Sequence, residues 1–332
     1  MRIKVKHVIL ISIITVVTFA GYILLKNLPE KPKHPYPSLD KQRAATFNKP
    51  LIKPVRILDS TSIVNDLKYL ASDTCEGRKP GSAGHEKAVD RIIARMRETG
   101  LDSFNNSLVQ EFTKGGENTK ARTGKNIVGW IKGAHSPEKY IIISAHYDHL
   151  GKIGDSVYYG ASDNASGIAC ILAMAEYFKQ NPLPCSLIFA AFDMEESGLE
   201  GADHFVNNLP QPLILSNIVL NINIDMIARN DENEIFVCGI YHNPSLIYAV
   251  KGVQDKTNTK VLMGHDTGNG HDDWTYQSDH FAFYKKKIPF LYIGVEDHAD
   301  YHKPTDTYGK INLSSYIENC NMITSLAKLL KP

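Results

Sequence analysis

The chain has 332 residues, of which 43% are hydrophobic and 22% charged, and its formal net charge is +1. This length and composition are typical of one large globular domain or two smaller ones. The near-neutral charge and the lack of a basic stripe with interleaved aromatic residues argue against nucleic acid as a partner.

The first 28 residues are predicted to be a membrane anchor or a signal peptide. The basic segment MRIKVKH precedes an unbroken apolar run from Val8 to Leu25, and about 18 to 20 apolar residues suffice to cross a bilayer. The basic flank should stay in the cytoplasm, so the chain that follows should be extracytoplasmic. A weak cleavage pattern precedes Gly21. We favour an anchor because the apolar run continues past that point, whereas cleavage would give a secreted or periplasmic protein.

Residues 29–57 are predicted to be a linker, and residues 58–332 a single folded domain. The linker has prolines at positions 29, 32, 35, 37, 50 and 54 among its lysines. This composition is typical of a stiff, extended spacer.

Strands and helices are predicted to alternate along the folded domain. Two helices come first, over residues 60–72 and 81–100. Strands rich in Val, Ile, Leu and Phe are predicted over residues 126–131, 139–146, 185–193, 217–226, 233–240 and 289–295. Further helices are predicted over residues 164–180, 199–208, 243–256 and 312–331. This pattern indicates an α/β fold with a mostly parallel, mixed central sheet and helices on both of its faces.

Polar residues follow the ends of four predicted strands, and the carboxyl ends of parallel strands meet at one edge of a sheet. These residues are His146 and Asp148; Asp193, Glu195 and Glu196; Asp225; and Glu296, His298 and His302, with Asp163 at the start of a helix. So many carboxylates at one edge would raise each other's pKa values, and a divalent cation would relieve that repulsion. Histidines and carboxylates suit zinc, whereas the five cysteines have no CxxC spacing and do not indicate a thiolate site.

Each of these residues taken alone has a simpler explanation. Asp163 is typical of a helix N-cap, and Glu195 and His302 fit solvated loops. Asp225 directly follows an apolar strand and is expected to be at least half buried. The convergence of several strand ends on one edge favours a metal site over these separate explanations.

The sequence resembles the co-catalytic di-zinc exopeptidases over residues 58–330. The segments HYDHLG, GASDNASG, DMEESGLEG, NIDMIA and DYHKPTDT occur in the order found in that family, which includes secreted bacterial leucine aminopeptidases, glutamate carboxypeptidase and glutaminyl cyclase. The resemblance implies the zinc-dependent exopeptidase fold, two zinc ions per chain and a peptide substrate.

The resemblance also implies which residues bind the metal ions. His146 and Asp225 would bind one zinc ion, and Glu196 and His302 would bind the second. Asp163 would bridge the two ions, since a carboxylate has two oxygens and can span metals about 3.5 to 4 Å apart.

Three further residues match catalytic positions of the family. Glu195 would be the general base that takes a proton from water. Asp148 would orient the ring of His146, which it can reach because residues two apart in a strand share a face. Tyr301 would donate a hydrogen bond to the developing oxyanion. His149 matches no ligand of the family and is expected behind the ligands or in a loop.

These roles predict a metal-dependent exopeptidase, and we favour an aminopeptidase. A carboxypeptidase of the same family and a glutaminyl cyclase-like acyltransferase remain alternatives, as does a binding ectodomain that has lost the chemistry. The complete ligand set argues against the last. The aminopeptidase is favoured because the sequence shows no inserted domain, which is an argument from analogy. Residues 264–281 either form a pocket wall or a surface loop with a helix starting at Ser278.

Overall fold

The central strands carry apolar side chains on both faces, and helices cover the sheet on each side. The computed structural model describes residues 34–47, 49–53, 56–115, 121–229, 232–267 and 272–330. The segment predicted as an anchor or signal lies outside these ranges. No helix within the described ranges is long and apolar enough to span a membrane.

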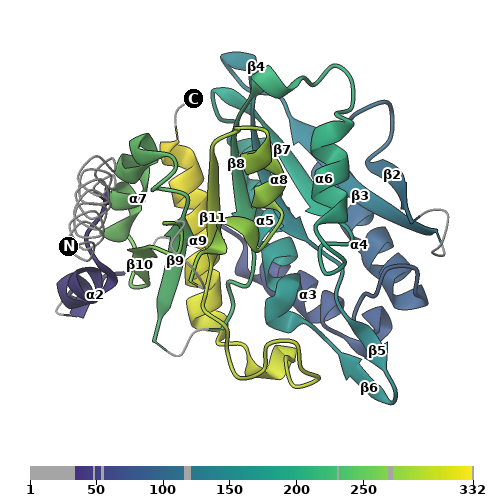
Figure 1. Cartoon of the computed structure of the whole chain (residues 1–332), viewed down its shortest axis with the longest axis horizontal. Coiled ribbons are helices and arrows are strands. Elements are labelled where there is room, and N and C mark those ends of the chain that lie inside the picture. The colour runs from purple at the N-terminus through teal and green to yellow at the C-terminus, as the bar shows by residue number, and fades with distance from the viewer. Residues whose placement is uncertain are drawn as a thin grey trace, which may run out of the picture. The chain divides into compact units, whose positions relative to one another are not determined.

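Nine strands of the described chain form one mixed sheet, in the order β1-β3-β7-β4-β8-β11-β9-β10, with β2 also paired to β3 (Figure 1). Their bounds are Asp102–Ser103 for β1, Val109–Lys114 for β2, Arg122–Ile131 for β3, Ser136–His146 for β4, Cys185–Phe192 for β7, Ile218–Ile224 for β8, Glu234–Cys238 for β9, Lys260–Met263 for β10 and Phe290–Gly294 for β11. Strands β7, β4, β8 and β11 are parallel, whereas β3 and β9 run antiparallel to their neighbours β7 and β11. The predicted mixed sheet is confirmed, with its parallel part at the centre.

The six predicted helices, α3 to α7 and α9, are present in the predicted order, and α2 and α8 add to them. Their bounds are Leu39–Phe47 for α2, Ser60–Leu70 for α3, Ala83–Thr99 for α4, Ser166–Gln180 for α5, Glu200–Asn207 for α6, Ile247–Gln254 for α7, His280–Lys285 for α8 and Leu313–Leu329 for α9. A separate hairpin is formed by β5, Gly151–Ile153, and β6, Ser156–Tyr158. Gly100 ends α4 with a φ of 73°, a left-handed conformation that glycine adopts without strain.

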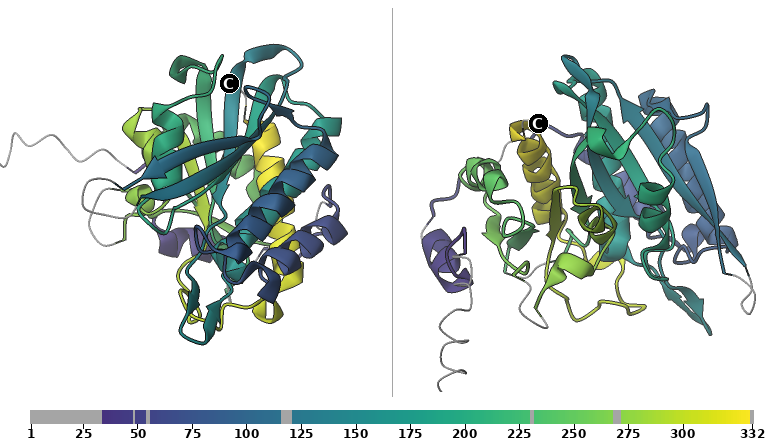
Figure 2. Two further views of the ribbon diagram at one scale, coloured as in Figure 1. Left: turned by 90° about the vertical axis from the view of Figure 1, so that its right-hand side faces the viewer. Right: turned by 45° about the horizontal axis from the view of Figure 1, so that its top comes forward.

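Helices cover both faces of the central sheet (Figure 2), and alternate residues of β4 belong to two different cores. Ile141 and Ile143 belong to the larger core, which contains side chains of α3, α4, α5 and α9. Tyr140 and Ile142 belong to the smaller core, which contains side chains of α6 and α8. Both faces of the central strands are therefore buried, because successive side chains of a strand point to opposite faces.

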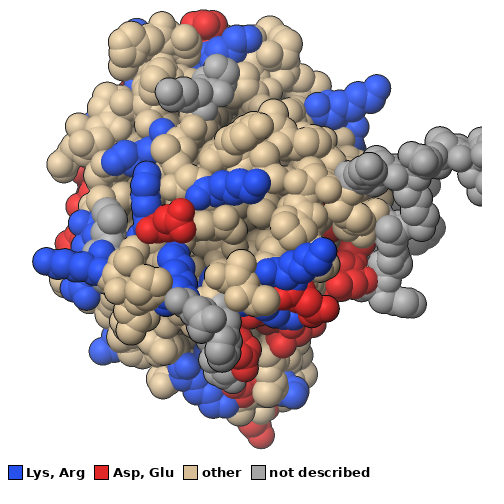
Figure 3. All heavy atoms as spheres, turned by 90° about the vertical axis from the view of Figure 1, so that its left-hand side faces the viewer, with Lys and Arg blue, Asp and Glu red and all other residues tan. Residues whose placement is uncertain are grey.

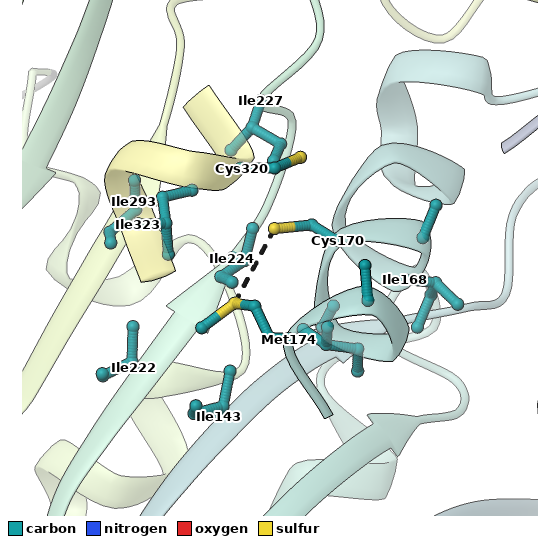
Figure 4. Packing of buried hydrophobic residues seen from close by; sticks show 14 of the residues in the cluster. Ile143, Ile168, Cys170, Met174, Ile222, Ile224, Ile227, Ile293, Cys320 and Ile323 are labelled. Atoms are coloured by element: carbon teal, nitrogen blue, oxygen red, sulfur yellow. Dashed lines mark hydrogen bonds between the residues drawn. The ribbon is translucent and has the colours of Figure 1, made fainter. Parts of the chain in front are cut away.

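The larger core is closely packed where α5 and α9 meet the sheet. Figure 4 shows Cys170 and Met174 of α5, Cys320 of α9 and Ile224 of β8 against one another, and Cys170 Sγ lies 3.8 Å from Met174 Sδ. All five cysteines are free and buried. Burial raises the pKa of Cys170 well above its ordinary value, so this thiol stays protonated and behaves as a small apolar side chain.

The expectation of an extended spacer is wrong for Leu39–Phe47, which forms α2. This stretch contains no proline, so nothing in it prevents a helix. The side chain of Gln42 accepts from Met263 N and donates to Met263 O, both at 2.8 Å, and so bonds to the edge strand β10.

A cavity of about 370 Å³ lies between α2 and α7. On this side of the molecule, Lys and Arg are spread among uncharged residues (Figure 3).

Candidate active site

Three parallel strands at the centre of the sheet bring polar residues together at their ends. His146 is the last residue of β4, Asp225 directly follows β8, and Glu195 follows β7 by three residues. Strand β4 pairs in parallel with both β7 and β8. All three residues therefore lie at the carboxyl edge of the sheet, where α/β proteins place their binding sites.

The first ligand cluster consists of His146, Glu195 and Asp225, whose donor atoms lie within 4.8 Å of one another. His146 Nε2 lies 3.1 Å from Asp225 Oδ1 and 3.3 Å from Asp163 Oδ1. His146 is 1% exposed and Asp225 is 6% exposed. Burial lowers the pKa of His146, but the carboxylates of Asp225 and Glu195 outweigh burial and raise that pKa well above its ordinary value.

The second ligand cluster contains Asp163, Glu196 and His302, together with His149. The donor atoms of His149, Asp163 and Glu196 lie within 4.8 Å of one another. His302 Nε2 lies 3.1 Å from Asp163 Oδ2 and 3.2 Å from Glu196 Oε2. Hydrogen bonds to these two carboxylates raise the pKa of His302 to about 10. The side chain of His302 is 39% exposed, so this cluster opens to solvent.

Asp163 lies between the two clusters. Its Oδ1 faces His146 and its Oδ2 faces His302. The carboxylate of Asp306 accepts hydrogen bonds from the backbone N–H groups of Ser162, at 3.0 Å, and Asp163, at 3.2 Å. These bonds hold the segment so that the Asp163 side chain is directed at both clusters.

Arg78 also holds this segment, although the sequence did not indicate a function for it. Its guanidinium is fully buried and donates to five backbone carbonyls, those of Leu70, Tyr147, Tyr159, Gly160 and Asp163. Arg78 thereby ties the chain beside His146 to the chain that carries Asp163. Arg78 lies in the segment EGRKPG, which marks a turn between two helices. Most of the carbonyls that Arg78 contacts lie 69 to 85 positions further along the chain, so the sequence alone does not reveal them.

Asp148 supports both His146 and the two glutamates. The Asp148 carboxylate accepts from Glu195 N at 3.0 Å and from Glu196 N at 3.4 Å. His146 Nδ1 lies 3.2 Å from the backbone oxygen of Asp148 and 3.7 Å from its Oδ1. Asp148 therefore orients the imidazole mainly through its carbonyl, while its carboxylate fixes the peptide that carries Glu195 and Glu196.

Glu195 and Tyr301 have the protonation properties that proton transfer and hydrogen-bond donation need. Burial raises the pKa of Glu195 well above its ordinary value, and Asp225 adds to the increase. The ring of Tyr301 stacks on that of His302 with 3.9 Å between centroids. Burial, followed by the charge of Asp163, raises the pKa of Tyr301 above its ordinary range. Its hydroxyl therefore stays neutral and can donate a hydrogen bond.

The end of the 264–281 segment reaches the first cluster, which the sequence left open. Ser278 Oγ donates to Asp225 Oδ2 at 2.7 Å and accepts from Asn223 Nδ2 at 2.8 Å. The neighbouring Asp279 is fully buried, and its carboxyl oxygens have no hydrogen-bond partner among the described residues. Helix α8 begins at His280. Part of this segment therefore lines the site.

The distances and the chemistry of the donor atoms fit a metal centre. Zinc binds N and O ligands at about 2.0 to 2.2 Å, so two donor atoms on one tetrahedral ion lie about 3.3 to 3.6 Å apart. The four pairs that link His146, Asp163, Asp225, Glu196 and His302 lie 3.1–3.3 Å apart, at or slightly below this spacing. The donors are imidazole and carboxylate groups, as is usual in catalytic zinc sites.

Comparison with known families decides the classification. The model of Peptidase family M28 matches residues 126–327. The chain belongs to peptidase family M28. The family predicted from the five segments is thus confirmed, and the M28 match covers the strands and loops that supply the site residues from His146 to His302.

Similar proteins and solved structures agree with the fold. Aminopeptidase YwaD of Bacillus subtilis is 35% identical over 119 residues, which are 35% of this chain and 25% of that protein. The chain spans about a quarter of the length of the first curated relatives it matches. A zinc aminopeptidase structure from Bacillus subtilis matches with a TM-score of 0.64 and 17% identity, covering 81% of this chain and 94% of that one. The glutaminyl cyclase of Porphyromonas gingivalis matches with a TM-score of 0.66 and 18% identity, covering 82% and 99%.

Proposed function

We propose that this chain is a zinc-dependent aminopeptidase that removes N-terminal residues from peptides. The position of Asp163 carries the proposal, because its two carboxylate oxygens face two separate groups of ligand atoms. His146 and Asp225 would hold one zinc ion, Glu196 and His302 the other, and Asp163 both. Zinc ions held there would lower the pKa of a bound water from 15.7 to about 7 and would polarise the scissile carbonyl.

The residues around the ligands supply the remaining parts of a hydrolytic mechanism. Glu195 lies beside His146 and Asp225 and has a raised pKa, so it can take a proton from water and later deliver it to the leaving amine. The neutral hydroxyl of Tyr301 would donate a hydrogen bond to the oxyanion that forms from the carbonyl. Asp148 fixes the peptide that carries Glu195, which keeps the carboxyl group in place between the two proton transfers.

The names of similar proteins, and not the charges near the site, favour an aminopeptidase over a carboxypeptidase. A carboxypeptidase would need a cation for the C-terminal carboxylate of its substrate. Arg229 and Lys310 both pair with Asp300, at 2.7 Å and 2.5 Å, so this single carboxylate offsets only one of their two positive charges. The carboxyl group of Asp279 has no hydrogen-bond partner among the described residues, and burial raises its pKa well above the ordinary value, so it stays protonated and adds no negative charge. The relative and the solved structure named as aminopeptidases agree with this choice.

A cleavage assay with blocked peptides tests the proposal. We expect the purified zinc-loaded protein to hydrolyse aminoacyl-anilides and peptides with a free N-terminus, and to lose this activity with a chelator. Peptides acetylated at the N-terminus should resist cleavage. Cleavage of those peptides at the C-terminus would contradict the aminopeptidase and indicate the carboxypeptidase. Release of ammonia from peptides with N-terminal glutamine, without hydrolysis, would indicate the glutaminyl cyclase.

We also propose that the domain works outside the cytoplasm, because basic residues precede the apolar run from Val8 to Leu25. A reporter enzyme that is active only outside the cytoplasm, fused after residue 332, should be active. An inactive reporter on a stable fusion protein would contradict this location.

A further inference from the structure

His149 lies directly behind Glu196, at a position for which the sequence motif gives no function. The residue is 1% exposed. Its Nδ1 lies 2.6 Å from Glu196 Oε1 and 3.6 Å from Asp163 Oδ2. Its Nε2 is buried without a hydrogen-bond partner among the described residues. The ring therefore makes its polar contact with the second cluster through Nδ1.

The distance from His149 to Glu196 fits a hydrogen bond and not a shared metal ion. Two ligand atoms on one tetrahedral zinc ion lie about 3.3 to 3.6 Å apart. The pairs formed by His302 with Asp163 and with Glu196, at 3.1 and 3.2 Å, lie just below that spacing, and the 3.6 Å between His149 Nδ1 and Asp163 Oδ2 lies within it. The 2.6 Å between His149 Nδ1 and Glu196 Oε1 is instead the length of a short, charge-assisted hydrogen bond. His149 thus differs from His302 in its contact with Glu196, which is shorter by 0.6 Å (2.6 Å against 3.2 Å).

The surrounding backbone keeps the His149 ring in this position. Gly160 packs so closely that a Cβ on it would lie 2.5 Å from His149 Cδ2, and its φ of +55° favours glycine. The backbone N–H of His149 donates to the carbonyl of Arg78 at 3.3 Å. The ring therefore packs against the segment that leads to Asp163, with its Nδ1 on Glu196.

A hydrogen bond at one carboxylate oxygen determines which oxygen is left for a metal. With Oε1 bonded to His149, Glu196 presents Oε2, the atom that lies 3.2 Å from His302 Nε2. The geometry points to His149 as a positioning residue that fixes Glu196 and thereby sets the affinity of the second zinc site. This inference rests on the proposed two-zinc centre and leaves the first site, at His146 and Asp225, unaffected.

Zinc titration of the metal-free full chain tests this inference without any substrate. His302→Ala identifies which of the two dissociation constants belongs to the second site. In His149→Leu, which has no donor, we expect the second constant to rise about 10- to 100-fold, as when a hydrogen-bond partner of a ligand is removed, while the first stays unchanged. His149→Asn should restore the second constant, because its amide N–H can donate to Glu196 from the position of Nδ1.

His280→Leu is the matched control. His280 is also fully buried, with one ring nitrogen 2.9 Å from the carbonyl of Trp274 and the other without a partner among the described residues. Its loss should leave the second constant unchanged, which separates the hydrogen bond to Glu196 from the loss of a buried ring in general.

The outcomes separate this inference from the proposal on which it rests. An unaltered second constant in His149→Leu would refute the inference alone, and so would a His149→Asn variant that binds the second ion as weakly as His149→Leu. If His149→Leu does not fold, His149→Asn decides: two unaltered constants support the donor role, and loss of the second refutes it. Fewer than two zinc ions on the unsubstituted chain would refute the two-zinc centre itself.

Discussion

The two ligand clusters of the site differ in how the fold supports them. His146 ends a central strand and Asp225 directly follows another, and both are almost fully buried. Glu196 and His302 lie on loops, and the side chain of His302 is 39% exposed. The sheet therefore fixes the first pair, whereas the second pair depends on hydrogen bonds from its surroundings. We expect the first site to bind zinc more tightly, because fewer groups must be ordered when the ion binds.

The largest effect on activity is expected at Glu195, which is proposed to transfer protons and not to bind a metal ion. Glu195→Gln should lower kcat by about 10² to 10⁴, the usual contribution of a general base, while both zinc ions stay bound. Steady-state kinetics together with elemental analysis of the same preparation measure the two effects. A variant with near-normal turnover would refute the role of Glu195, and one that has lost a zinc ion would make Glu195 a ligand.

Removing a ligand from the exposed cluster should affect the second zinc site and leave the first intact. We expect His302→Ala to retain one zinc ion and to lose the second, because Asp163 and Glu196 alone leave that site with carboxylates only. Elemental analysis after dialysis against a weak chelator should show a fall from two ions to one. Full occupancy of both sites in this variant would contradict the ligand role of His302.

Ser278→Ala should weaken the first zinc site and leave the second unchanged. It removes the 2.7 Å hydrogen bond to Asp225 Oδ2, so we expect the dissociation constant of the first zinc ion to rise by about tenfold or more. The second constant should stay the same, as measured by titration of the metal-free protein. Equal weakening of both sites would show that the two clusters are not supported independently.

The smallest expected effect is on the pH dependence of the metal-free protein. The pKa of His302 is raised from 6.5 to about 10 in the folded state. The imidazolium then stabilises the fold fully below pH 6.5, and this stabilisation is lost as the pH rises through about 10. The effect should be modest because the side chain is partly exposed.

Thermal unfolding of the metal-free protein between pH 6.5 and pH 10 measures this contribution. His302→Ala should lose less stability over that interval than the unsubstituted protein, because the histidine that gives up its proton is absent. An equally steep loss in the variant would place the titration on another group.

The sequence was sufficient to predict six of the nine described strands of the sheet and the residues at their ends, because an apolar run followed by His146 or Asp225 is a local pattern. The short or edge strands β1, β2 and β10 were not predicted. It did not predict that β9 runs antiparallel to β11, since the composition of a strand does not encode its direction. The hydrogen bonds of Ser278 and His149 were missed for a different reason. Their partners, Asp225 and Glu196, lie 53 and 47 positions away, so only the folded chain brings them together.

Helix α2 was not predicted because the stretch is short and lies between proline-rich segments that are typical of an extended chain. Prolines on both sides of Leu39–Phe47 indicate an extended chain, and the helix is stabilised by contacts with β10, such as those of Gln42 with Met263. Tertiary contacts of this kind override local preference.

Anomalous diffraction at the zinc edge from crystals of the zinc-loaded protein tests the proposed centre most directly. Two peaks about 3.5 to 4 Å apart, one on each side of the Asp163 carboxylate, are the expected result. A single peak, or two peaks that Asp163 does not bridge, would contradict the assignment of this carboxylate as the link between two metal sites.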